Sequence, residues 1–317
     1  MKQTTPDWAK KSPYDKYFDF IGPKADRYTI LTEHIEKLKL NSAVISVAGN
    51  RHIFIFPPGQ KSLRSAGGIF PFSGKSPYLF SAHYDRVEGS PGANDNSIAV
   101  FHLLNIAVKL SARTGSGSGS GSLSNEWIIV FTDKEELSAG ETLEDQGSFT
   151  LAKKIKSWGL DKAKIFNFDA CGTGNVFIIS TTTDHILKDT DRPNISKIKK
   201  SINQLRDYAL ETADLLRFDK VLLAPTPFSD DVGFLRAGLA AQTITILPQD
   251  EAQKYEELLR TRPEFVDVII SGKVKEPQER RHLPETWRNI NNASDTPLRL
   301  TPQFFEKVCH FMENLCR

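Results

Sequence analysis

The chain has 317 residues, 39% of them hydrophobic and 25% charged, which is ordinary for a globular protein. Its 41 Lys and Arg residues nearly balance its 39 Asp and Glu residues, so the charge gives no reason to expect a nucleic acid or membrane partner. No apolar run approaches the ~20 residues of a membrane span, and no signal-like segment opens the chain, so we expect a cytoplasmic protein. The three cysteines, at positions 171, 309 and 316, do not form a disulfide framework.

The hydrophobic pattern predicts strands and helices in alternation. The expected strands are Ala43–Val47, His52–Phe56, Tyr78–His83, Trp127–Phe131, Lys164–Phe168, Val176–Ser180, Val221–Leu223 and Thr243–Leu247. The expected helices are Ala25–Leu40, Asn96–Ala112, Thr150–Trp158, Ile195–Leu216, Phe228–Ala237 and Pro302–Leu315. Such alternation favours a single α/β domain over residues 1–317, a three-layer sandwich around a mixed, mostly parallel sheet of about eight strands.

Two segments lack this pattern. Residues 115–122 are a strict Gly-Ser alternation, which predicts a flexible loop over about 113–124. The segment from Gln249 to Asn289 is charged and poor in periodicity, so we expect a long loop there, for example a lid inserted at 249–290.

His83, Asp95, Glu135, Glu136 and Asp169 each end an apolar run that resembles a strand, or follow one closely. Strand ends at one edge of an α/β sheet are where such folds build their sites. Imidazole and carboxylates together suit zinc or another divalent metal, with one Glu left to handle a proton. The order His, Asp, Glu-Glu, Asp therefore indicates a two-metal hydrolase.

Each of these residues also has an ordinary interpretation. Asp95 could bridge two cations, or it could only cap the following helix. The Glu pair could divide its work between a metal and a water, or form a solvated acidic turn, and Asp133 is an alternative ligand. Asp169 alone is an ordinary turn residue. Asp85 could accept the second N–H of His83, as happens at many metal-bound histidines.

Seven short motifs occur together in one order: HYD, GANDN, EEL followed by GS, then FD, SD and a terminal DT. With these motifs the chain resembles the co-catalytic zinc aminopeptidase family, which also includes glutamate carboxypeptidases, glutaminyl cyclases and the inactive transferrin-receptor ectodomain. The resemblance extends from about Tyr78 to the C-terminus. It implies a zinc-exopeptidase domain of phosphorylase/hydrolase-like fold.

The resemblance also implies roles for individual residues. His83 and Asp169 would bind one zinc ion, Asp95 would bridge to a second, and Glu136 would bind that second ion. Asn291 stands where the family has its last ligand, a His four residues before the Asp-Thr pair, and an amide oxygen is a poorer zinc donor than imidazole.

The same resemblance makes Glu135 the general base, with Asp85 supporting the metal-bound His83. It also implies a cis peptide between Asp95 and Asn96. A second departure follows the SD pair, where the family often has a His near the substrate and this chain has Asp231.

Three explanations of Asn291 stay open: it ligates weakly and leaves one or two ions, His282 takes its place, or catalysis has been lost. The leading interpretation is an aminopeptidase-type exopeptidase that hydrolyses N-terminal residues of peptides through a metal-activated water. The alternative is a catalytically impaired binding module. A glutaminyl-cyclase-like acyltransferase ranks lower, because the chain weakens the Asp, Glu and His set on which those enzymes rely. The sequence assigns no oligomeric state.

Overall fold

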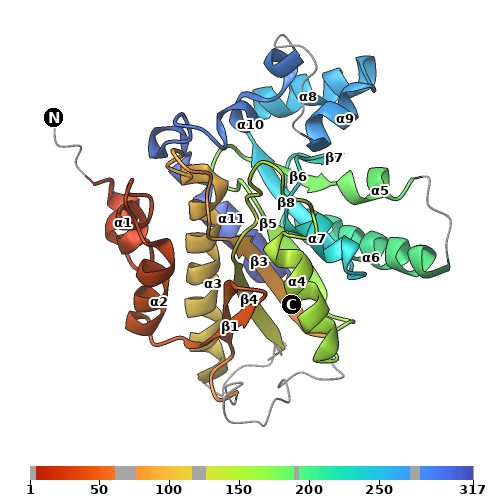
Figure 1. Cartoon of the computed structure of the whole chain (residues 1–317). Coiled ribbons are helices and arrows are strands. Elements are labelled where there is room, and N and C mark those ends of the chain that lie inside the picture. The colour runs from red at the N-terminus through yellow and green to blue at the C-terminus, as the bar shows by residue number, and fades with distance from the viewer. Residues whose placement is uncertain (1–4, 61–75, 116–125, 189–192, 272–278, 317) are drawn as a thin grey trace.

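The protein folds around one eight-stranded sheet in the order β1-β2-β4-β3-β5-β8-β6-β7. The computed structural model describes residues 5–60, 76–115, 126–188, 193–271 and 279–316 (Figure 1). The strands are β1 (Asn41–Val47), β2 (Asn50–Phe56), β3 (Tyr78–His83), β4 (Trp127–Thr132), β5 (Lys164–Phe168), β6 (Val176–Ser180), β7 (Val221–Ala224) and β8 (Ala241–Leu247).

The centre of the sheet is parallel, and its flanks contain antiparallel pairs. Strands β4, β3, β5 and β8 are parallel neighbours, whereas β1, β2 and β4 pair antiparallel, as do β6 and β8. The central strands are buried throughout, which is why they are continuous apolar runs in the sequence. The mixed α/β sheet expected from the sequence is confirmed.

Helices cover both faces of this sheet (Figure 1). The helices are α1 (Tyr17–Phe20), α2 (Arg27–Lys37), α3 (Ile98–Gly115), α4 (Gly147–Ser157), α5 (Thr182–Ile186), α6 (Pro193–Leu215), α7 (Asp230–Arg236), α8 (Gln249–Thr261), α9 (Phe265–Ser271), α10 (Glu285–Asn289) and α11 (Phe305–Asn314). Side chains of α2, α3, α6 and α11 share a core with one face, and those of α4 and α7 share a core with the other. In the part of the chain described, no helix has both the length and the hydrophobicity needed to span a bilayer.

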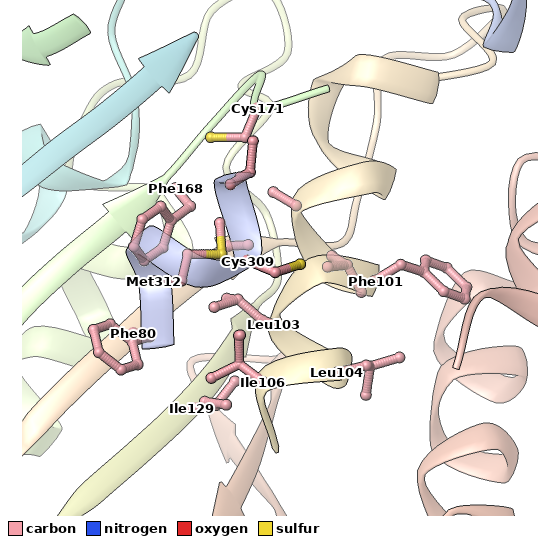
Figure 2. Packing of buried hydrophobic residues seen from close by; sticks show 14 of the residues in the cluster. Phe80, Phe101, Leu103, Leu104, Ile106, Ile129, Phe168, Cys171, Cys309 and Met312 are labelled. Carbon is pink, nitrogen blue, oxygen red and sulfur yellow. The ribbon is translucent and has the colours of Figure 1, made fainter. Parts of the chain in front are cut away.

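The largest core lies between the sheet, α3 and α11. Figure 2 shows Phe80 and Ile129 of the sheet facing Leu103 and Ile106 of α3, with Met312 of α11 beside them. Helix α3 is apolar over most of its circumference because the sheet covers one side and the N-terminal segment packs on another. This packing fixes the start of α3, which directly follows the turn that carries Asp95.

The prediction of a long loop over 249–289 is wrong, because most of the described part of this segment is helical. Helix α8 buries Ala252, Tyr255 and Leu258, three residues apart, and the α10 residue Trp287 packs edge-on against Tyr255 with ring centroids 5.0 Å apart. This stripe is narrow, and charged residues surround it, so the helical period is hard to see in the sequence. The Gly/Ser loop expected at 113–124 falls mostly outside the described residues, and α3 itself continues to Gly115.

The three cysteines are free, as expected, and the structure shows that all three are buried. In α11, Phe305, Val308 and Phe311 face the core, and Phe304 just before it is partly buried.

Candidate metal centre

The candidate site lies where three parallel strands end. His83 is the last residue of β3, Glu135 and Glu136 follow β4, and Asp169 follows β5. Because β4, β3 and β5 are adjacent and parallel, their carboxyl ends meet at one edge of the sheet. Asp95 reaches the same edge from the turn before α3.

His83, Asp95 and Asp169 converge on one point. Each offers a ligand atom, and the three atoms lie within 4.8 Å of one another. His83 Nε2 is 3.0 Å from Asp95 Oδ1 and 3.7 Å from Asp169 Oδ1, but it is buried and makes no directed hydrogen bond. Two carboxylates and an otherwise unsatisfied imidazole nitrogen therefore fit a zinc ion as a donor set.

Asp85 joins the ends of β3 and β4. Its carboxylate lies 3.4 Å from His83 Nδ1 and accepts the backbone N–H groups of Glu135 at 3.2 Å and Glu136 at 3.0 Å. Burial opposes ionisation of Asp85, but the adjacent His83 imidazole and the backbone N–H groups of Glu136 and Glu135 leave its pKa below the ordinary value. Asp85 could thus orient the imidazole and position the Glu pair at the same time.

A relay of polar side chains under the sheet edge orients Asp169. Ser229 Oγ donates to Asp169 Oδ2 at 2.6 Å, Asn167 Nδ2 donates to Ser229 Oγ at 2.7 Å, and Ser81 Oγ donates to Asn167 Oδ1 at 2.9 Å. Ser229 is the serine of the SD motif, so one role of that motif is to hold the Asp169 carboxylate in position.

The terminal DT motif holds the Asp95 turn. The Asp295 carboxylate accepts the backbone N–H of Asn94 at 2.8 Å and of Asp95 at 3.0 Å. The Asn96 side chain donates to Phe168 O at 2.8 Å, which ties the turn to β5. The peptide between Asp95 and Asn96 is cis, as expected from the family resemblance.

Glu136 and Asp95 Oδ2 face Asn291 beside this first cluster. With its amide nitrogen toward them, Asn291 donates to Glu136 Oε1 at 2.6 Å and to Asp95 Oδ2 at 3.1 Å. With its oxygen toward them, the same amide would be a neutral third ligand beside two carboxylates. Burial, followed by the Asp95 charge, raises the pKa of Glu136 to about 9. Crowded carboxylates of this kind favour a nearby cation.

Glu135 borders the pocket described below, and Gln146, later in the same loop, hydrogen-bonds to its carboxylate. Gln146 Nε2 donates to Glu135 Oε1 at 3.1 Å, and burial raises the pKa of Glu135 well above its ordinary value. Gly147 makes this return of the loop possible, because a Cβ there would lie 1.7 Å from Asp133 O. The GS motif is therefore needed for a close approach of two backbones.

The alternative ligands lie elsewhere. Asp133 Oδ2 accepts the Arg51 N–H at 2.8 Å on β2, and His282 is exposed with its ring edge-on to Phe265 at 5.3 Å. Asp231 is buried in α7, where burial raises its pKa to about 7, and it is absent from the described pocket wall. The structure gives no support to Asp133 or His282 as ligands.

A pocket of about 60 Å³ opens beside the cluster, bordered by Asp95, Glu135, Asp169 and Asn291. Its apolar wall is formed by Pro227, Phe228, Trp287 and Ile290, the last two from the segment expected to be a loop.

Sequence reasoning missed Gln146, Asn167 and Arg27. Arg27 lies in α2 and contacts residues 84–97, the segment that follows His83 and carries Asp95. Gln146 had one weak signal, its place directly before the GS motif. The other two had none, because each acts through a contact distant in sequence.

The site is a buried cluster of one His and several carboxylates at the carboxyl edge of a mixed α/β sheet, a donor set that suits a divalent metal ion. The sequence model of peptidase family M28 matches residues 69–263, more than half of the chain. The chain belongs to this family, and membership supports a metal-dependent, peptidase-like enzyme. None of the curated proteins matches the chain significantly.

Solved structures show the same fold at low sequence identity. A zinc-dependent exopeptidase from Parabacteroides distasonis is 12% identical, with a TM-score of 0.56 and 99% of each chain covered. A glutaminyl cyclase from Porphyromonas gingivalis is 15% identical, with a TM-score of 0.56, over 95% of this chain and 94% of that one. The zinc aminopeptidase BSAP from Bacillus subtilis is 17% identical, with a TM-score of 0.49 over 84% of this chain; the chain spans only about half its length, 49%.

Proposed function

We propose that the protein is a zinc-dependent exopeptidase of aminopeptidase type. The convergence of His83, Asp95 and Asp169 beside a pocket that Glu135 borders carries this proposal. These three ligands would hold one ion tightly. Glu136 and Asn291 would form a weaker second position with Asp95, because the third ligand there is a neutral amide.

A bound zinc ion would lower the pKa of a water and polarise the scissile carbonyl. Glu135 would accept a proton from the attacking water and pass it to the leaving amine. Burial raises the pKa of Glu135 well above its ordinary value, and a cation bound nearby would lower it again toward the range that suits a general base. Gln146 would keep the Glu135 carboxylate directed at the pocket through its hydrogen bond.

The pocket favours the free N-terminus of a peptide or a small aminoacyl compound as substrate. The Asp95 carboxylate, which borders the pocket, would lie beside the substrate's free α-amine. A wall that includes Phe228, Trp287 and Ile290 would surround one side chain of modest size. Residues further along a peptide would extend away from this small pocket.

The test is Glu135→Gln, assayed on a panel of aminoacyl and dipeptide substrates after zinc loading. We expect turnover to fall about 10²- to 10⁴-fold, the contribution of a general base, while zinc content stays at the wild-type level. Glu141→Gln is the matched control, because Glu141 lies in the same loop but is paired with Lys134 at 2.6 Å and does not border the pocket. Wild-type turnover in Glu135→Gln would eliminate the mechanism.

Two other functions remain testable. A binding module is favoured by Asn291 and Asp231, and it predicts no hydrolysis at any zinc concentration. A glutaminyl-cyclase-like acyltransferase has a structural neighbour in its favour, and it predicts conversion of N-terminal Gln peptides to pyroglutamate. We rank it lower because Asn291 weakens the Asp95 and Glu136 side of the site.

A further inference from the structure

Arg27 is a buried charged residue far from the family-matched part of the sequence. It is the first residue of α2 and 6% exposed. A cation at a helix N-terminus opposes the helix dipole, and a buried charge is costly unless hydrogen bonds satisfy it. Local structure therefore does not explain Arg27, and its tertiary contacts must.

The guanidinium of Arg27 hydrogen-bonds to both ends of the segment between His83 and Asp95. Nη1 donates to the stretch directly after His83, and Nη2 donates to the stretch around Asp95. The acceptors are Tyr84 O (3.1 Å), Asp85 O (3.0 Å), Pro91 O (2.8 Å), Gly92 O (3.3 Å) and Ser97 Oγ (2.7 Å).

The surroundings are shaped to admit this side chain. Gly92 has φ +59°, and a Cβ there would lie 2.7 Å from Arg27 Nη2, so a larger residue would displace the guanidinium. The Phe20 ring lies under the guanidinium, 4.7 Å from its Cζ. Burial lowers the pKa of Arg27 to about 10, which leaves it charged near neutral pH.

The rest of the N-terminal segment contacts the same loop. The Tyr17 hydroxyl donates to Ala93 O at 2.9 Å, and Arg86 of the loop donates to Ile21 O at 3.1 Å and Gly22 O at 2.7 Å. Arg86 also donates to Pro91 O at 3.1 Å within the loop, and Arg27 adds a planar group from another element that binds both ends of the loop at once.

We propose that Arg27 is a positioning residue for the metal centre, a clamp that sets the spacing between His83 and Asp95. Residues 84–85 continue directly from His83, and residues 91–97 carry Asp95, so joining them limits how far the two ligands can separate. The expected effect of Arg27 on zinc affinity rests on the proposed function, because it requires that His83 and Asp95 bind zinc. The clamp makes the N-terminal segment, outside residues 69–263, a part of the site.

The test measures zinc dissociation constants by chelator competition for the wild type, Arg27→Gln, Arg27→Lys and Leu31→Ala. Leu31 is buried on the same helix α2, so Leu31→Ala weakens the docking of α2 without removing a hydrogen bond to the loop. We expect Arg27→Gln to weaken zinc binding about 10- to 100-fold, as loss of a supporting contact does, and Leu31→Ala to change it by about twofold or less. Arg27→Lys should weaken zinc binding about as much as Arg27→Gln, because an ammonium group keeps the positive charge but cannot donate to both ends of the loop as the planar guanidinium does.

Hydrogen exchange of the zinc-free proteins provides a readout that does not need the metal. Backbone N–H groups of residues 84–97 should exchange faster in Arg27→Gln than in Leu31→Ala at equal loss of thermal stability. Equal exchange and equal zinc affinity in these two variants would overturn the clamp, as would wild-type affinity in Arg27→Lys. A wild type that takes up no zinc would refute the proposed function, and the exchange data would still decide whether Arg27 positions the loop.

Discussion

Removing the hydroxyl of Ser229 should weaken zinc binding more than it weakens the fold. Ser229 Oγ donates to Asp169 Oδ2 at 2.6 Å, and a hydrogen bond to a charged group contributes about 1.5–3 kcal/mol. If that contribution serves to orient the ligand, Ser229→Ala loses about 10- to 150-fold in zinc affinity, at about 1.4 kcal/mol per tenfold. Chelator competition measures this change, and calorimetry of the zinc-free protein measures stability separately.

Ser81→Ala is the matched control at the other end of the relay. Ser81 is buried and donates to Asn167 Oδ1, but Asn167 still donates to Ser229 without it. We therefore expect Ser81→Ala to cost stability, about 1–3 kcal/mol for an unsatisfied buried group, and to leave zinc affinity near the wild type. Unchanged zinc affinity in Ser229→Ala, or an equal loss in both variants, would refute the assignment of Asp169 as an oriented ligand.

Three further predictions concern the second position, the pocket and the pH dependence. Asn291→His should raise the tightly bound zinc from one ion to two per chain by elemental mass spectrometry, and an unchanged count would show that position 291 does not limit the second site. Ile290→Ala should enlarge the pocket and shift kcat/KM toward bulky N-terminal residues by about tenfold, whereas an unaltered preference would remove Ile290 from the specificity wall. Burial lowers the pKa of His52 from 6.5 to about 4, so the unfolded chain binds a proton first and stability is lost as pH falls from about 6.5 to 4. In urea denaturation, His52→Asn should reduce the loss of unfolding free energy between pH 6.5 and 4 by up to about 3 kcal/mol. Parallel plots of unfolding free energy against pH for the two proteins would contradict this prediction.

The strands were the most predictable part of the fold. The bounds of β3, β5 and β6 coincide with those expected from the sequence. These strands are buried on both faces, so they stand out in the sequence as continuous apolar runs. Helix α8 was missed because its stripe of Ala252, Tyr255 and Leu258 is narrow, and because Trp287, which covers it, comes much later in the chain.

The sequence by itself determined the kinds of ligand available and the strand ends that carry them. The HYD, GANDN and EEL motifs place His83, Asp95 and the Glu pair beside one sheet edge, because parallel strands bring their carboxyl ends together. Tertiary structure alone decided that Asp133 turns to β2, that Ser229 and Asp295 hold the ligand segments, and that Arg27 joins both ends of the loop. These contacts link residues far apart in the chain, and local propensity has no information about such distant partners.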